Sequence, residues 1–165
     1  MTNITTLKVG TLGHPTISGE TKVYVVDNII DYAKALTAKG SALGATDTIE
    51  AIQVPIGSLI LAAGVEQIVA GNSTTLTLDL GYTGGDVDEF VDGFDAQASA
   101  AGTFSASLDV AGPVVTVVGA TADTIDLLFA TLTGTLTTGK VRVWAMLADI
   151  SGGNKKQPGI VQLGS

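Results

Sequence analysis

The chain has 165 residues and a formal net charge of −8, with 45% hydrophobic and only 15% charged residues. This length suits one domain with a core of its own, and the charged share lies below the roughly 25% of an average soluble domain. The absence of cysteine excludes disulfides and thiolate metal sites, and a single histidine leaves almost no material for a Ser-His-Asp triad or a histidine-based metal site.

The charges are segregated along the chain. No Lys or Arg occurs between Ser41 and Gly139, a stretch that holds twelve acidic residues, so every basic residue lies in the flanks. A body this acidic repels phosphate backbones, and we therefore expect no direct nucleic-acid binding. The N-terminus lacks the basic start and apolar core of a secretory signal, and no apolar run reaches about 18 residues, so we expect no membrane partner and synthesis in a cytoplasm.

Glycine and threonine are abundant and long Lys/Glu-rich periodic segments are absent, which favours short strands and turns. The class we expect is therefore all-β. Residues 1–23 contain four glycines or prolines among threonines and serines, which is typical of an arm. We expect this N-terminal arm to be followed by a β-sandwich domain over residues 24–150 and a C-terminal arm over residues 151–165.

The first apolar segment of the expected domain, Tyr24–Tyr32, is β-branched and aromatic, which predicts a bent strand or a strand pair. Residues Ala33–Ala38 could form a helical turn before Gly40, but a strand is our preferred interpretation. Asp47–Val54 predicts the next strand, which ends at Pro55.

The most regular pattern of the chain lies at its centre. Ser58–Val69 is apolar, and in Thr74–Leu80 three leucines alternate with Thr75, Thr77 and Asp79. Alternation with period two indicates a strand with one buried face, and the four residues between the two segments suit a reversal. We therefore predict a β-hairpin here.

An acidic segment follows the predicted hairpin. Asp86 could cap a helix and Glu89 could reach back to it, while Val87, Phe90 and Val91 have helical spacing, so we predict one short helical turn near residues 86–92. The same segment offers a candidate calcium site through Asp86, Asp88 and Asp92, although it does not fit an EF-hand loop. A solvated acidic turn is the preferred interpretation, and we predict no cofactor.

Four further strands are expected at Thr103–Val110, Val114–Val118, Thr124–Leu132 and Lys140–Ile150. The segments Ala45–Glu50 and Thr121–Asp126 echo each other, and each opens a strand after a loop. Two Greek-key halves would produce such an echo. The sequence therefore predicts a two-sheet antiparallel β-sandwich of about eight strands, with a jelly roll as the expected topology.

Trp144 and Arg142 lie two residues apart on the same face of the last predicted strand. A single aromatic there could stack on a sugar but more often lies in a core or a subunit interface. His14 is interpreted as a surface or contact residue, because it is the only histidine and lies in the arm. The predicted interaction residues are Lys8, His14, Lys22, Arg142, Trp144, Lys155 and Lys156.

Several segments carry a resemblance to a known class of proteins: Val54–Leu61, Leu78–Gly81, Asp92-Gly93, Asp123–Ile125 and Gly139–Ala145. Together they resemble virion structural proteins of tailed bacteriophages, of the type that decorates or cements capsids. The resemblance covers roughly residues 45–150. It implies a jelly-roll-like domain without enzymatic activity, located on the capsid surface and made in the host cytoplasm.

The same resemblance implies binding to the major capsid protein and assembly as a homotrimer or another homo-oligomer. We expect the two arms to make these contacts while the acidic body faces outward. The alternative is a head-fibre or tail appendage domain that binds a host-surface receptor or glycan.

Overall fold

The computed structural model describes residues 3–4, 22–83, 85–107, 116–117 and 122–149, and the predicted all-β class is confirmed there. The described residues form one helix and ten strands: β1 (Asn3–Ile4), β2 (Lys22–Asp31), α1 (Tyr32–Lys39), β3 (Thr48–Val54), β4 (Ser58–Val69), β5 (Thr75–Tyr82), β6 (Val91–Asp95), β7 (Phe104–Ser107), β8 (Thr116–Val117), β9 (Asp123–Thr133) and β10 (Lys140–Asp149).

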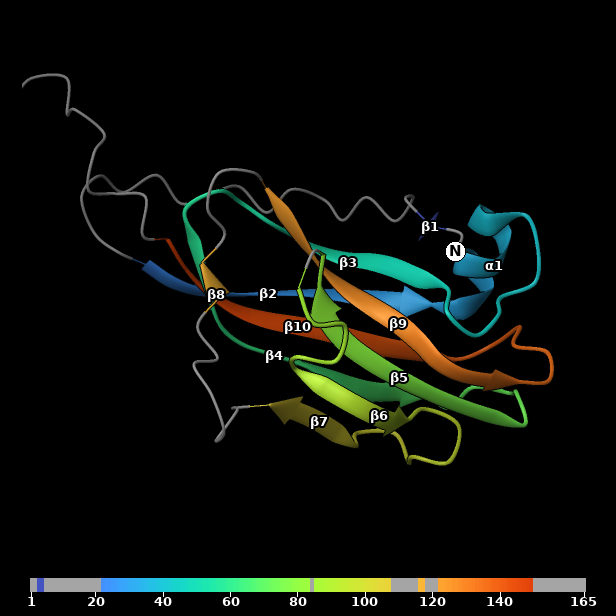
Figure 1. Cartoon of the computed structure of the whole chain (residues 1–165). Coiled ribbons are helices and arrows are strands. Elements are labelled where there is room, and N and C mark those ends of the chain that lie inside the picture. Colours follow the sequence, from blue (N-terminus) through green and yellow to red (C-terminus); the bar gives the residue numbers. More distant parts are fainter. Residues whose placement is uncertain (1–2, 5–21, 84, 108–115, 118–121, 150–165) are drawn as a thin grey trace, which may run out of the picture.

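These strands form two sheets that face each other (Figure 1). Sheet A has the order β1-β3-β9-β5-β6, and sheet B has the order β2-β10-β4-β7, with β8 paired to β4. Every pairing is antiparallel except that of β1 with β3. The predicted two-sheet sandwich is therefore confirmed.

Eight of the strands pair in a nested fashion. The strands β2 and β10, β3 and β9, β4 and β7, and β5 and β6 are four antiparallel pairs. For every pair of facing residues in them, the mean of the two residue numbers lies between 85 and 89. The chain is thus one long hairpin that has been wound up into two sheets. This winding, with two four-stranded sheets, is the topology of a jelly roll.

The echo detected in the sequence corresponds to one of these nested pairs. Its two segments open β3 and β9, which are antiparallel neighbours, and Glu50 lies directly opposite Asp126.

The inward rows of both sheets form the core. Sheet A contributes Leu78, Leu80, Ile125, Leu127 and Phe129, and sheet B contributes Val65, Val141, Val143, Ala145 and Leu147, all fully buried.

The preferred strand at Ala33–Ala38 is wrong, because this segment belongs to helix α1. Asp31 caps the helix by accepting a hydrogen bond from the N–H of Ala33 at 3.0 Å, and Gly40 ends it in the left-handed region. These two caps favour a helix here although the apolar pattern between them is weak.

No helix in the described part of the chain is long and apolar enough to cross a membrane.

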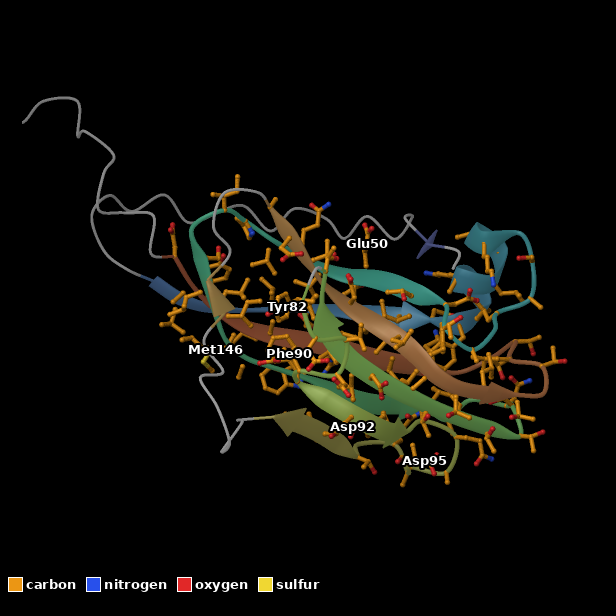
Figure 2. The ribbon with its side chains drawn as sticks, in the orientation of Figure 1. Glu50, Tyr82, Phe90, Asp92, Asp95 and Met146 are labelled. Atoms are coloured by element: carbon orange, nitrogen blue, oxygen red, sulfur yellow. The ribbon has the colours of Figure 1, made fainter. Side chains whose placement is uncertain are left out.

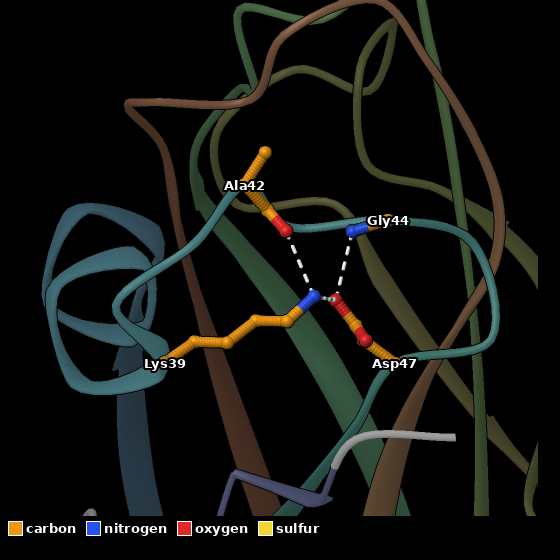
Figure 3. A network of polar contacts seen from close by, with 4 residues as sticks. All are labelled: Lys39, Ala42, Gly44 and Asp47. Atoms are coloured by element: carbon orange, nitrogen blue, oxygen red, sulfur yellow. Dashed lines mark hydrogen bonds and ion pairs between the residues drawn. The ribbon is translucent and has the colours of Figure 1, made fainter.

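A polar network closes the loop between α1 and β3 (Figure 3). The Nζ of Lys39 donates to the carbonyl of Ala42 at 2.8 Å and forms an ion pair with Asp47, whose Oδ2 also accepts the N–H of Gly44 at 2.8 Å. Both charged side chains are more than nine-tenths buried. A buried charge is tolerated only when it is paired and hydrogen-bonded, and this pair meets both conditions.

The predicted hairpin between Ser58–Val69 and Thr74–Leu80 is also wrong. Both strands exist as β4 and β5, but β4 lies in sheet B and β5 in sheet A. The intervening link crosses between the sheets, and Asn72 holds it against the link that precedes β10 by accepting the N–H groups of Thr137 and Thr138. Alternation identified the strands but carries no information about which sheet each one joins.

The helical turn predicted near residues 86–92 is absent from the described residues. The segment forms turns up to Phe90, where β6 follows, and the N–H of Phe90 donates across to the carbonyl of Leu80 at 2.8 Å. Val87 is exposed, so the helical spacing of apolar residues does not correspond to one buried face. A register shift in β6 opposite β5 explains why Val91 and Phe94 are both buried at a spacing of three.

Replacing Gly139 should destabilise the sandwich strongly. Its φ is 128°, and a Cβ there would lie 2.7 Å from the ring of Tyr32 and 2.9 Å from the Cα of Gly71. Backbone strain and overpacking each cost about 1–3 kcal/mol. We expect Gly139→Ala to lower the free energy of unfolding by at least about 2 kcal/mol, measured by urea denaturation.

Gly102→Ala is the matched control, because Gly102 also has a positive φ, of 86°, but a Cβ added there would have no other atom within 4 Å. It should show the conformational cost alone. Equal losses in the two variants would contradict the packing argument for Gly139.

Candidate interaction surface

The outer face of sheet A is acidic. Its strands β3, β9, β5 and β6 lie between residues 48 and 133, a stretch without Lys or Arg. Glu50 and Asp126 lie opposite each other on β3 and β9, and Figure 2 shows Glu50 on β3 and both Asp92 and Asp95 on β6. This face therefore repels anions and other copies of itself.

A small hydrogen-bonded cluster surrounds Asp126. Its two carboxylate oxygens accept the hydroxyls of Thr83 and Thr124, each at 2.7 Å. Burial is the largest influence on this carboxyl and raises its pKa above the ordinary value of 3.8, Asp123 adds to the increase, and the two hydroxyls oppose it. The acidic face thus contains one carboxylate, that of Asp126, whose charged form is disfavoured because it is partly buried.

The candidate calcium residues lie at the tip of the wound hairpin. The carboxyls of Asp86 and Asp88 are hydrogen-bonded to each other, which lowers the pKa of Asp86 and raises that of Asp88. Among the residues that the structure describes, no three His, Cys, Asp or Glu side chains are grouped so that they could hold a metal ion. Among the described residues, this pair of carboxyls is therefore not part of a larger ligand set.

The outer face of sheet B is apolar by contrast. Val23 and Val25 on β2 are 58% exposed, Ile29 on the same strand is 45% exposed, and Phe104 on β7 is 61% exposed. Between them, Trp144 and Met146 on β10 are partly exposed, and the register places Met146 beside Val25. Large apolar side chains gathered on one face mark an interaction surface more often than scattered ones do.

Arg142 lies at the centre of this face. Its Nη1 contacts Glu66 Oε2 on β4 at 2.7 Å, and its Nε lies 3.3 Å from Asp27 Oδ2 on β2. Together with Val25, Phe104 and Trp144, these three charged residues line a shallow hollow of about 270 Å³. The guanidinium therefore joins three adjacent strands and offsets one of the two carboxylate charges beside it.

Of the predicted interaction residues, the structure brings Arg142 and Trp144 together in this hollow. Lys8, His14, Lys155, Lys156 and the side chain of Lys22 lie outside the described residues. The sequence reasoning missed Asp27, Glu66 and Phe104. The alternation of Val23, Val25 and Ile29 with residues that pack on the core was a signal for the apolar face, since these three share one side of a strand.

The strand order and the two contrasting faces define the protein as a jelly-roll β-sandwich with one acidic and one apolar sheet. No protein-family model matches the chain, and no curated protein matches it.

Two solved structures of phage capsids contain chains with a similar fold. A chain of the cyanophage Pam1 capsid asymmetric unit has 17% sequence identity and a TM-score of 0.55, and the alignment covers 87% of this chain and 96% of that one. A chain of the Ralstonia phage GP4 capsid has 17% identity and a TM-score of 0.53, with coverage of 83% and 88%. The sequence resemblance to phage virion proteins is thus confirmed at the level of the fold.

Asp126→Asn should stabilise the protein at neutral pH. Because the folded-state pKa is raised, the folded state holds this proton more tightly than the unfolded state, and stability falls as pH rises from about 4 through the raised pKa. We expect the variant to melt at a higher temperature than the wild type at pH 7, with the difference closing below pH of about 4.

The control is Asp92→Asn, which removes an exposed carboxylate from the same face. It should change the melting temperature less at pH 7. An Asp126→Asn variant that is less stable than the wild type at pH 7 would show that the threonine hydrogen bonds to the carboxylate outweigh its burial.

Proposed function

We propose that this protein is a non-enzymatic structural component of a phage virion, which decorates or cements the capsid by binding the major capsid protein. The observation that carries the proposal is the jelly roll, which aligns over most of its length with chains of two phage capsids. The alignment covers most of those chains as well, so the shared unit is the whole domain. The proposed location is the capsid surface, after synthesis in the host cytoplasm.

The distribution of charge supports a decorating role. The acidic face of sheet A suits an exposed outer surface, because like-charged neighbours on a lattice repel each other there and do not aggregate. The positive charges lie in the sequence flanks, in residues 1–40 and 140–165. We propose that the N-terminal arm 1–23 and the C-terminal arm 151–165 contact the capsid, through residues that include Lys8, His14, Lys22, Lys155 and Lys156.

Multivalent attachment would make modest contacts sufficient. Many copies on a lattice, organised as homotrimers or other homo-oligomers, bind with an avidity that exceeds the affinity of one arm. A cementing protein of this kind should raise the temperature at which the capsid comes apart, because it binds the assembled lattice and not its dissociated subunits.

Deleting Met1–Ile17 should weaken binding to capsids that lack this protein. If the N-terminal arm supplies one of two linked contacts, we expect the apparent affinity to fall by at least about tenfold. Occupancy is measured by co-sedimentation of the chain with capsids, and the melting temperature of the decorated capsid gives a second measure. Full occupancy by the truncated chain would remove the N-terminal arm from the proposal.

The variant Asp92→Lys provides a control on the face that is proposed to point outward. It changes the charge of sheet A without touching an arm, so occupancy should equal that of the wild type. Loss of binding in this variant, with binding retained by the truncated chain, would indicate that sheet A faces the capsid.

A second candidate function is receptor or glycan binding by a head-fibre or tail appendage. The hollow on sheet B favours it, because Trp144 and Phe104 could stack on a sugar while Asp27 and Glu66 accept hydroxyls. A glycan array screened with the wild type and with Trp144→Ala separates the two functions. Specific binding that is lost in the variant would support the appendage, and a blank array supports decoration.

A further inference from the structure

The outer face of sheet B carries the residue types that protein interfaces favour. Trp, Phe, Met and Arg are enriched in such interfaces relative to the rest of a protein surface. All four types occur here, with Phe104 on β7 and with Arg142, Trp144 and Met146 on β10. The side chain of Phe104 is the most exposed of the large hydrophobic residues that the structure describes. This composition suits contact with a protein surface better than contact with a sugar, which needs several hydroxyl partners.

The charges of the hollow on this face indicate what a partner should carry. Arg142 contacts one oxygen of each neighbouring carboxylate, Oε2 of Glu66 at 2.7 Å and Oδ2 of Asp27 at 3.3 Å. The second oxygen of each carboxylate makes no hydrogen bond or ion pair with a residue that the structure describes. One cation therefore faces two anions, and a second cation would balance the site.

The surroundings strengthen the preference for a cation. The side chain of Glu66 is only 17% exposed, so water screens its charge less than that of a fully exposed acid. The other residues that line the hollow are apolar, namely Val25, Phe104 and Trp144. A basic side chain that arrives together with apolar neighbours would meet both the unbalanced charge and the apolar wall.

The position of the hollow in the sandwich relates it to the acidic face. Sheets A and B face each other through the core, so their outer faces point in opposite directions (Figure 1). When sheet A points away from the capsid, sheet B points toward it. The apolar face, which loses little on leaving water, is then the one that meets a partner, and the acidic face stays in solvent.

We propose that the outer face of sheet B docks on the capsid protein, and that its hollow receives an apolar segment of that protein with one basic side chain. The apolar part lies against Phe104 and Trp144, and the lysine or arginine lies beside Asp27 and Glu66. This inference rests on the proposed function, to which it adds a contact made by the folded domain itself. A domain contact linked to the arm contacts raises the avidity of each copy.

The first test measures how well the full-length chain binds capsids that lack this protein, by co-sedimentation. Phe104→Ala removes the exposed aromatic, and Asp27→Lys places a cation where the partner's cation is expected. Each variant should lower the apparent affinity by at least about tenfold, because a central aromatic contact is lost or like charges are brought together. Circular dichroism checks that both variants keep the strand content of the wild type.

Two matched controls lie away from this face. Ile56→Ala truncates an apolar residue that is 55% exposed between β3 and β4, comparable with Phe104 at 61%. Asp92→Lys makes the same change of charge as Asp27→Lys, but on β6 of sheet A (Figure 2). Both controls should bind capsids like the wild type.

The second test is hydroxyl-radical footprinting read by mass spectrometry, which distinguishes docking of the domain from attachment by the arms alone. Aromatic and sulfur-containing side chains react readily with these radicals. Phe104, Trp144 and Met146 should therefore lose reactivity when the chain binds capsids. Tyr82, which is partly exposed at the end of β5 in sheet A, should keep its reactivity.

The outcomes separate this inference from the proposed function. Wild-type binding that Phe104→Ala and Asp27→Lys leave unchanged, with Trp144 still reactive on the capsid, would overturn the inference and leave the proposed function standing. A wild type that does not bind capsids would overturn both.

Two further results would also overturn the docking surface. If Trp144 is already unreactive in the free protein, another part of the chain covers the hollow. If a glycan binds specifically and Trp144→Ala abolishes that binding, the hollow is a sugar site.

Discussion

The structure depends on one constraint, the nested antiparallel pairing of the chain about its own midpoint. The strands β2, β3, β4 and β5 each pair with a strand near the mirror position in the second half, and the centre of this arrangement is the acidic turn around Asp86 and Asp88. Winding the long hairpin sends successive segments to opposite sheets, so that the inward rows of sheets A and B meet in one core. The link at Asn72 and the tight contact at Gly139 are needed where the chain crosses between the sheets.

The nested pairing also explains how the segregation of charged residues along the chain produces two differently charged sheets. Sheet A takes its long strands from the middle of the chain, which has no basic residue, whereas sheet B includes β2 and β10 from the flanks. Its central strand β10 therefore brings Lys140 and Arg142 next to the acids of its neighbours, and each forms an ion pair there, with Asp31 and with Glu66. The acidic face of sheet A and the apolar face of sheet B follow from the topology together with the position of the charges in the chain.

Much of the fold could be predicted from the sequence because strands with one buried face leave a period of two. The inward row Val141, Val143, Ala145 and Leu147 follows directly from this pattern. The assignment of β4 and β5 to one hairpin failed because alternation does not encode which sheet a strand joins. At Phe90 and Val91 a turn followed by a bulged strand imitated helical spacing, and at α1 the caps Asp31 and Gly40 decided a segment whose apolar pattern was weak. Of the interaction surface, the sequence indicated Arg142 and Trp144. Their neighbours Asp27 and Glu66 come from strands far away in sequence, and only the register of the folded sheet brings them together.

The nested pairing also orders the events by which the sandwich can assemble. Thr77 pairs with Asp95, 18 residues later, whereas Asp31 pairs with Lys140, 109 residues later. The entropy lost on closing a loop grows with its length, so the innermost pair forms at the smallest cost and each outer pair is brought into range by the one inside it. Folding should therefore proceed outward from the acidic turn. Among the described residues, strand β2 is then the last long strand to be ordered, because its pairing with β10 closes the longest loop of the nested set.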